Sequence, residues 1–126
     1  MERCRRLPDA ELAVMQALWR AGTPLTRPQL DVALAEKQWA ASTVVALLSR
    51  LEAKGYIDHQ KQGRGYLYRA LVPQQAYLEQ ESKTLLGGLY QGKPINFIAA
   101  LHDCGALNEE DLAELRAQLD ALSEKG

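Results

Sequence analysis

The chain has 126 residues, which is enough for one globular domain or for a small domain joined to an assembly element. No apolar run approaches the roughly 18 residues of a membrane-spanning helix, and the first residues lack the apolar core of a secretory signal. The composition therefore argues against a membrane protein and a secreted one, and we expect a soluble, cytoplasmic protein.

The net charge of -1 hides two unlike parts of the chain. Residues 1–72 hold 11 Lys and Arg against 7 Asp and Glu, whereas residues 73–126 hold 4 against 9. Because phosphates repel an acidic surface, this asymmetry predicts that only the N-terminal part faces a polyanion.

Two helices are predicted before residue 40. The first begins at Pro8 and Asp9 and ends at Gly22, which suits a helix C-cap. The second begins at a capping box formed by Thr26 and Gln29. It is short, ends near residues 35–37, and has as its apolar positions Leu30, Val32 and Leu34.

A third helix is predicted from Ser42, as N-cap, to Gly55, as a left-handed terminator. Its inner stripe consists of Val44, Leu47, Leu48 and Leu51. The opposite side is made of small residues: Ser42, Ala46, Ser49 and Ala53. Small outward residues suit a second buried face or a helix that lies in a DNA groove, and this stretch alone leaves both open.

After Gly55 the hydrophobic period changes from 3.6 to 2, which indicates two short strands around Tyr56 and Ile57 and around Tyr66 to Tyr68, with "QKQGRG" as the turn. Three helices followed by a hairpin with a basic tip predict a winged helix-turn-helix. In that fold the third helix enters the major groove, and Arg64 at the tip of the wing reaches a phosphate or a minor groove. The alternative for "GRG" is a solvated, flexible turn.

The C-terminal part is predicted to be helical: one helix over residues 73–91, a short one within residues 93–105, and a last one capped by Asn108. The last helix repeats leucine at 3-4-3 spacing, at Leu112, Leu115, Leu119 and Leu122. This seam packs against a second copy of the chain or, alternatively, on the helix at residues 73–91. We therefore predict a mainly α fold with a small β-hairpin, divided into a DNA-binding head (1–72) and a helical dimerisation domain (73–126).

Five motifs in this order resemble the penicillinase repressor family, the BlaI/MecI type of transcriptional repressor. They are "LPDAELAVMQALW", "STVVALLSRLEAKGYI", "GRGYLYRALV", "TLLGGLYQG" and "LNEEDLAELRAQLDAL". The resemblance implies a homodimer that binds an inverted-repeat operator on double-stranded DNA and represses transcription.

The resemblance also implies the site residues. Bases are read by Ser42, Thr43, Val45 and Ala46, and phosphates are held by Ser49, Arg50, Lys54, Lys61 and Arg64. The dimer contacts are Leu85, Leu89, Leu112, Leu115, Leu119 and Leu122. The chain departs from the family at Val45 and Ala46, where polar residues are commoner; apolar side chains can touch thymine methyl groups but cannot read a hydrogen-bond pattern.

The sequence also bears on the signal that would relieve repression. The copper-responsive CopY branch ends in a cysteine cluster that this chain lacks, which argues against copper sensing. His59 and His102 have no partners at ligand spacing, so we expect no metal and no cofactor. Cys4 and Cys104 are expected to be reduced thiols, with a redox role for Cys4 left open by its arginine neighbours. The resemblance to the antibiotic-responsive branch implies that a sensor protease cuts the C-terminal part, and such a cut would fall here within residues 93–105.

Competing functions belong to other classes. An enzyme is not supported, because no nucleophile and base, phosphate-binding loop or metal cluster is recognisable. A winged-helix module that binds protein, and a ligand-responsive regulator of another winged-helix family, remain alternatives. A steep loss of binding with salt would identify phosphate contacts.

Overall fold

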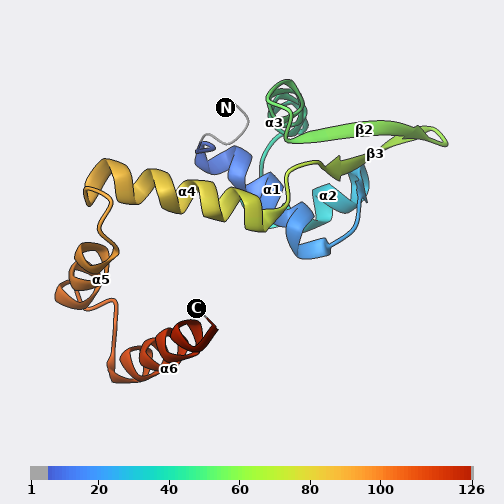
Figure 1. The fold of residues 1–126 in the computed structure, drawn as a ribbon. Coiled ribbons are helices and arrows are strands. Elements are labelled where there is room, and N and C mark those ends of the chain that lie inside the picture. Colours follow the sequence, from blue (N-terminus) through green and yellow to red (C-terminus); the bar gives the residue numbers. More distant parts are fainter. Residues whose placement is uncertain (1–5, 126) are drawn as a thin grey trace. The chain divides into compact units, whose positions relative to one another are not determined.

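The computed structural model describes residues 6–125, so Cys4 lies outside the described residues. It divides into two compact units between Ser82 and Lys83 (Figure 1). The first unit holds α1 (Asp9–Ala21), β1 (Leu25–Thr26), α2 (Arg27–Ala33), the 3-10 turn η2 (Ala35–Lys37), α3 (Ala41–Ala53), β2 (Ile57–Gln62) and β3 (Gly65–Ala70). Helix α4 (Gln74–Leu89) is shared, and the second unit adds α5 (Pro94–Asp103) and α6 (Glu109–Lys125). The predicted fold class is confirmed.

The helix ends follow local capping chemistry. Gly22 ends α1 in the left-handed conformation, with φ of 70°, as predicted. At α2 the Thr26 hydroxyl accepts a hydrogen bond from the Gln29 backbone N–H, and the Gln29 side chain accepts one from the Thr26 N–H at 2.8 Å, so the predicted capping box is confirmed.

The predicted N-cap of α3 was wrong. The helix begins one residue before Ser42, at Ala41, and its N-cap is Ala40. The Ala40 carbonyl accepts from the N–H groups of Thr43 and Val44, and no side chain caps this end. Backbone geometry alone starts the helix, which leaves the Ser42 side chain exposed within its first turn.

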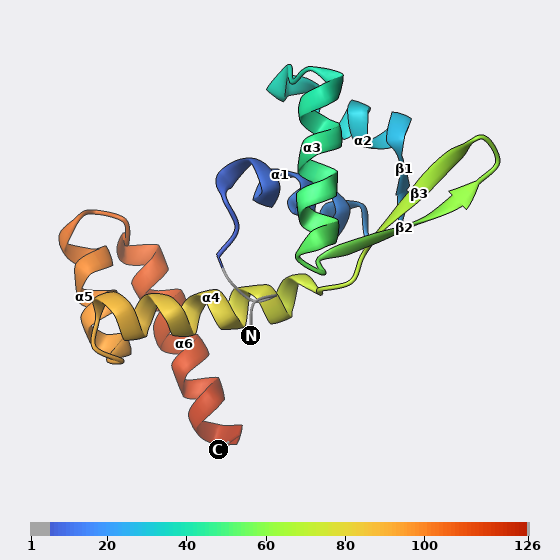
Figure 2. The same ribbon diagram turned by 90° about the horizontal axis from the view of Figure 1, so that it is seen from above.

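The sheet has three antiparallel strands in the order β1-β3-β2, one more than the sequence predicted. The two-residue β1 pairs with β3 through Leu25 opposite Tyr68 and Thr26 opposite Leu67. The hairpin strands are longer than expected, because four residues of the predicted turn pair in the sheet: Gln60, Lys61, Gln62 and Gly65. The turn is therefore only Gly63 and Arg64, and the hairpin projects past the helices of its unit (Figures 1 and 2).

One core holds the first unit together, and it draws on α1, α2, α3, β2 and the start of α4. Its most buried side chains are Leu7, Val14, Met15, Leu30, Leu51, Tyr56 and Ile57. Val32, predicted as an apolar position of the second helix, is 77% exposed, because α2 turns only its Leu30 side into this core.

The first half of α4 belongs to this unit through Tyr77. This side chain is buried against Trp19 and Tyr56, and its hydroxyl accepts a hydrogen bond from the backbone N–H of Leu7 at 2.9 Å. Trp19 in turn donates from its indole nitrogen to the Val72 carbonyl at 2.9 Å. The compact unit therefore extends past residue 72, where we placed the joint of the domains.

The second unit contains no fully buried side chain from α5 or α6. Asn108 and Asp111 cap α6 reciprocally, with the Asp111 N–H donating to the Asn108 side chain at 2.8 Å. Helix α4 continues through Gly87 and Gly88 to Leu89 despite the low helix propensity of glycine. Within residues 6–125 no helix is both long and apolar enough to cross a membrane.

Candidate nucleic-acid interface

Helix α3 has one buried and one exposed side. Val44, Leu47, Leu48 and Leu51 are at most 4% exposed and pack into the core, as the sequence predicted. On the other side Ser42, Thr43 and Ser49 are exposed, Val45 is 51% exposed, and Ala46 is half-buried. The first turns of this side of α3 thus carry only small side chains, and the longer Arg50 and Glu52 follow near the end of the helix.

The cations predicted to hold phosphates fall into two groups. Arg50 on α3, Lys61 on β2 and Arg64 at the hairpin tip are exposed. The ammonium of Lys54, by contrast, lies 2.5 Å from a carboxylate oxygen of Glu11 on α1. The Glu11 side chain is only 5% exposed, so Lys54 neutralises a buried carboxylate.

The two faces of the hairpin differ in chemistry. The register places His59 opposite Tyr68 and Lys61 opposite Tyr66, so these four side chains share the face that continues from the core residue Ile57. Tyr68 packs partly against the core, and Tyr66 is 45% exposed. Both tyrosines thus share one strand face, and Tyr68 packs partly on the core.

On the other face Asp58 and Arg69 form a two-pronged ion pair, with nitrogen to oxygen distances of 3.0 and 2.6 Å. The hydrogen bonds from Arg69 hold the pKa of the Asp58 carboxyl below its usual value, and they raise the pKa of the Arg69 guanidinium. This pair fixes the register of the strands at the base of the hairpin.

Two contacts next to α3 were missed by sequence reasoning. Arg27, at the start of α2, donates to Asp31 at 3.0 Å and to the Ala41 carbonyl at 3.3 Å, which ties α2 to the first turn of α3. His59 of β2 lies with its Nδ1 2.6 Å from a carboxylate oxygen of Glu52 on α3. The contacts of Arg27 with Ala41 and of His59 with Glu52 join residues on different elements, which periodicity within one element cannot reveal.

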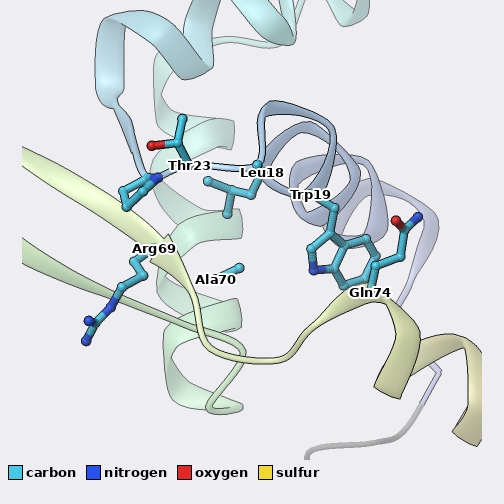
Figure 3. Close-up of a pocket in the computed structure, with 8 residues that line it drawn as sticks. Leu18, Trp19, Thr23, Arg69, Ala70 and Gln74 are labelled. Atoms are coloured by element: carbon cyan, nitrogen blue, oxygen red, sulfur yellow. The ribbon is translucent and has the colours of Figure 1, made fainter.

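A depression of about 310 Å³ lies elsewhere in the first unit, between the end of α1, the loop before β1, and the end of β3 (Figure 3). Trp19 and Gln74 lie side by side on one side, Thr23 and Arg69 lie on the other, and Leu18 lies between them. Within residues 6–125 no group of three His, Cys, Asp or Glu side chains could hold a metal ion.

In the second unit the predicted seam is partly exposed. Leu89, Leu119 and Leu122 are 71%, 49% and 61% exposed, whereas Leu85, Leu112 and Leu115 are half-buried. Leu115 also lines a hollow of about 610 Å³, whose walls are mainly apolar side chains of α4, α5 and α6, among them Leu86, Phe97, Ile98 and Leu101. Cys104, after α5, is an exposed free thiol.

Comparison with known proteins identifies the family. The penicillinase repressor family model matches residues 7–121. The chain belongs to the penicillinase repressor family. It is 27% identical to the penicillinase repressor of Bacillus licheniformis over 91% of this chain and 90% of that protein. It is 30% identical to an uncharacterized 16.5 kDa protein of Latilactobacillus sakei over 95% of this chain and 82% of that protein.

A solved structure also matches this chain. The DNA-binding domain of the repressor BlaI superposes with a TM-score of 0.53 at 28% identity, covering 61% of this chain and 94% of that domain. Penicillinase repressors are DNA-binding transcriptional repressors, and this is the function class of the chain. Membership excludes the alternative of a regulator from another winged-helix family.

Proposed function

We propose that the chain represses transcription as a homodimer whose two heads bind an inverted-repeat operator through α3 and the β2-β3 hairpin. The observation that carries this proposal is the exposed, small-residue side of α3, set beside a hairpin whose tip carries Arg64. The major groove is about 12 Å wide and accepts a helix whose leading side chains are short.

Base reading is assigned to the exposed first turns of α3. Ser42 and Thr43 supply hydroxyl groups, which pair with either kind of base edge, and Val45 and Ala46 supply methyl groups that fit against thymine. Ser49, Arg50, Lys61 and Arg64 contact phosphates, where they set the register of each head but read no sequence. Lys54, assigned from the sequence to the DNA backbone, contributes less in this proposal because Glu11 holds its ammonium.

Dimerisation is assigned to the second unit. Leu119 and Leu122 on α6 are 49% and 61% exposed and lose contact with water only when another surface covers them, and the apolar hollow beside Leu115 offers a complementary one. Leu85, Leu89, Leu112, Leu115, Leu119 and Leu122 form the seam of this proposal. Two joined heads gain affinity from effective concentration, so a dimer binds its operator far more tightly than one head does.

Relief of repression by a sensor protease is part of the same proposal. The segment from Lys93 to Gly105 contains α5, which carries no fully buried side chain and therefore has little packing to lose when it unwinds into a protease. A cut there would separate the heads from the leucine seam and remove the gain from joining them.

Selection of bound sequences from a random duplex library tests the proposal, followed by titration of the selected site at two salt concentrations. We expect an inverted repeat and a steep salt slope. Arg64→Ala should weaken binding to every sequence, whereas Ala46→Thr should change the preferred base. Binding that ignores both sequence and salt would refute the proposal and favour a protein-binding surface on α3.

A further inference from the structure

The acidic residue Glu52 lies on the side of α3 that the proposed function turns to DNA. It follows Val45 by seven residues and Ser49 by three, so all three share one stripe of the helix. Glu52 is also the only Asp or Glu of α3, and it is only half-buried. An unpaired carboxylate at this place would repel the phosphates of a bound duplex.

His59, on strand β2 of the hairpin, contacts the Glu52 carboxylate. Its Nδ1 lies 2.6 and 2.9 Å from the two carboxylate oxygens of Glu52, and the two side chains are 41% and 36% exposed. Figure 2 shows β2 running from the end of α3 into the projecting hairpin. The contact therefore joins α3, which is the recognition helix of the proposed function, to the base of the hairpin, which is its wing.

The aromatic side chains of β3 hold the imidazole in place. The ring of Tyr66 stands edge-on to the His59 ring at a centroid distance of 5.0 Å, and that of Tyr68 lies at 5.9 Å. The imidazole thus lies between the Glu52 carboxylate of α3 and the two tyrosine rings of β3, which restrict its rotamers.

We propose that Glu52 and His59 are a positioning pair that links wing and recognition helix and makes DNA binding depend on the protonation of His59. The inference rests on the proposed DNA interface and deepens it. Protonated His59 neutralises Glu52 and adds a positive charge next to the phosphates. Neutral His59 leaves the carboxylate charge uncompensated.

The direction of the pH effect follows from linkage. The phosphates of bound DNA favour the protonated imidazole, so binding takes up protons, and lower pH strengthens binding. Histidine is the side chain whose charge ordinarily changes between about pH 5 and 8. The charged groups next to His59 along β2 are Lys61, on the same strand face, and Asp58, on the opposite face. Asp58 is paired with Arg69, which lowers its pKa, so it stays ionised throughout this range.

The test is a titration of the selected operator at constant salt between pH 6 and 8, with the full chain. We expect the wild-type dissociation constant to fall at least about fivefold from pH 8 to pH 6, the lower end of ordinary coupling between two sites. His59→Gln should remove this dependence. His102→Gln, at the end of α5, is the matched control because it changes the only other histidine of the chain, and it should keep the wild-type profile.

The Glu52→Gln variant distinguishes an effect of the Glu52–His59 pair from an effect of His59 by itself. It should bind more tightly than wild type at pH 8, because the carboxylate charge is gone, and should show a shallower pH profile. Circular dichroism checks that each variant is folded. An unchanged pH profile in His59→Gln or in Glu52→Gln would overturn the inference. Failure of the proposed function looks different, since the wild type would then show no sequence preference at any pH.

Discussion

Replacement of Lys54 by methionine tests the contact between Glu11 and Lys54 within the core of the head. The substitution keeps the length of the apolar stem but removes the ammonium that lies 2.5 Å from the buried carboxylate of Glu11. Removing one partner of a fully buried pair costs about 3–5 kcal/mol, whereas exposed pairs contribute about 1 kcal/mol or less. Because the Lys54 side chain is 40% exposed and water screens its charge, we expect a loss of about 2 kcal/mol.

Urea unfolding followed by tryptophan fluorescence measures this loss, since Trp19 and Trp39 both lie in the first unit. For a domain of this size the same change lowers Tm by about 8–16 °C. The double variant with Glu11→Met also removes the buried charge, so it should be less destabilised than the sum of the two single variants. A Lys54→Met variant within about 0.5 kcal/mol of wild type would refute the reasoning.

Three further predictions concern other contacts. Tyr77→Phe leaves a buried backbone N–H without its acceptor and should cost about 1–3 kcal/mol in urea unfolding. Burial raises the pKa of Tyr77. The stability that depends on the neutral Tyr77 hydroxyl is therefore fully present below the ordinary tyrosine pKa of about 10 and is lost as pH rises through the pKa of the folded state. Tm measured from pH 8 to 11 should consequently fall more steeply in wild type than in Tyr77→Phe. Leu119→Asp should give monomers in analytical ultracentrifugation, whereas Ala117→Asp on the opposite side of α6 should stay dimeric; monomers or dimers from both would contradict the seam. Arg69→Ala should raise the Asp58 pKa measured by NMR toward its ordinary value.

The fold was predictable where the signal is local. The Thr26 capping box, the left-handed Gly22 and the buried stripe of α3 each follow from residues a few positions apart, and all three are confirmed. Strand β1 was missed because two residues carry no period; Leu25 and Thr26 become a strand only by pairing with β3. The N-cap predicted at Ser42 was wrong, because the helix already begins at Ala41 with Ala40 as its N-cap and without a side-chain cap.

The tertiary position of α4 was less predictable. Its apolar residues indicate a helix, but they do not tell which of two neighbouring units the helix packs against. Tyr77 contributes to the core of the first unit through its contacts with Leu7 and Trp19, which lie more than 50 residues away in sequence. The division at Ser82 therefore depends on long-range packing that the local pattern does not contain.

The sequence likewise does not tell which cations of the candidate interface are free to bind phosphates, and this number can be measured. The sequence from Arg50 to Arg69 contains five cations, counting both ends. If all five bound phosphates in both heads of a dimer, the slope of log K against log salt concentration would be about -9. The structure pairs Lys54 with Glu11 and Arg69 with Asp58, while Arg50, Lys61 and Arg64 have no ion pair within residues 6–125. Three cations per head give a slope of about -5. A measured slope near -9 would mean that both ion pairs open on DNA, whereas a slope near -5 would mean that they remain part of the fold.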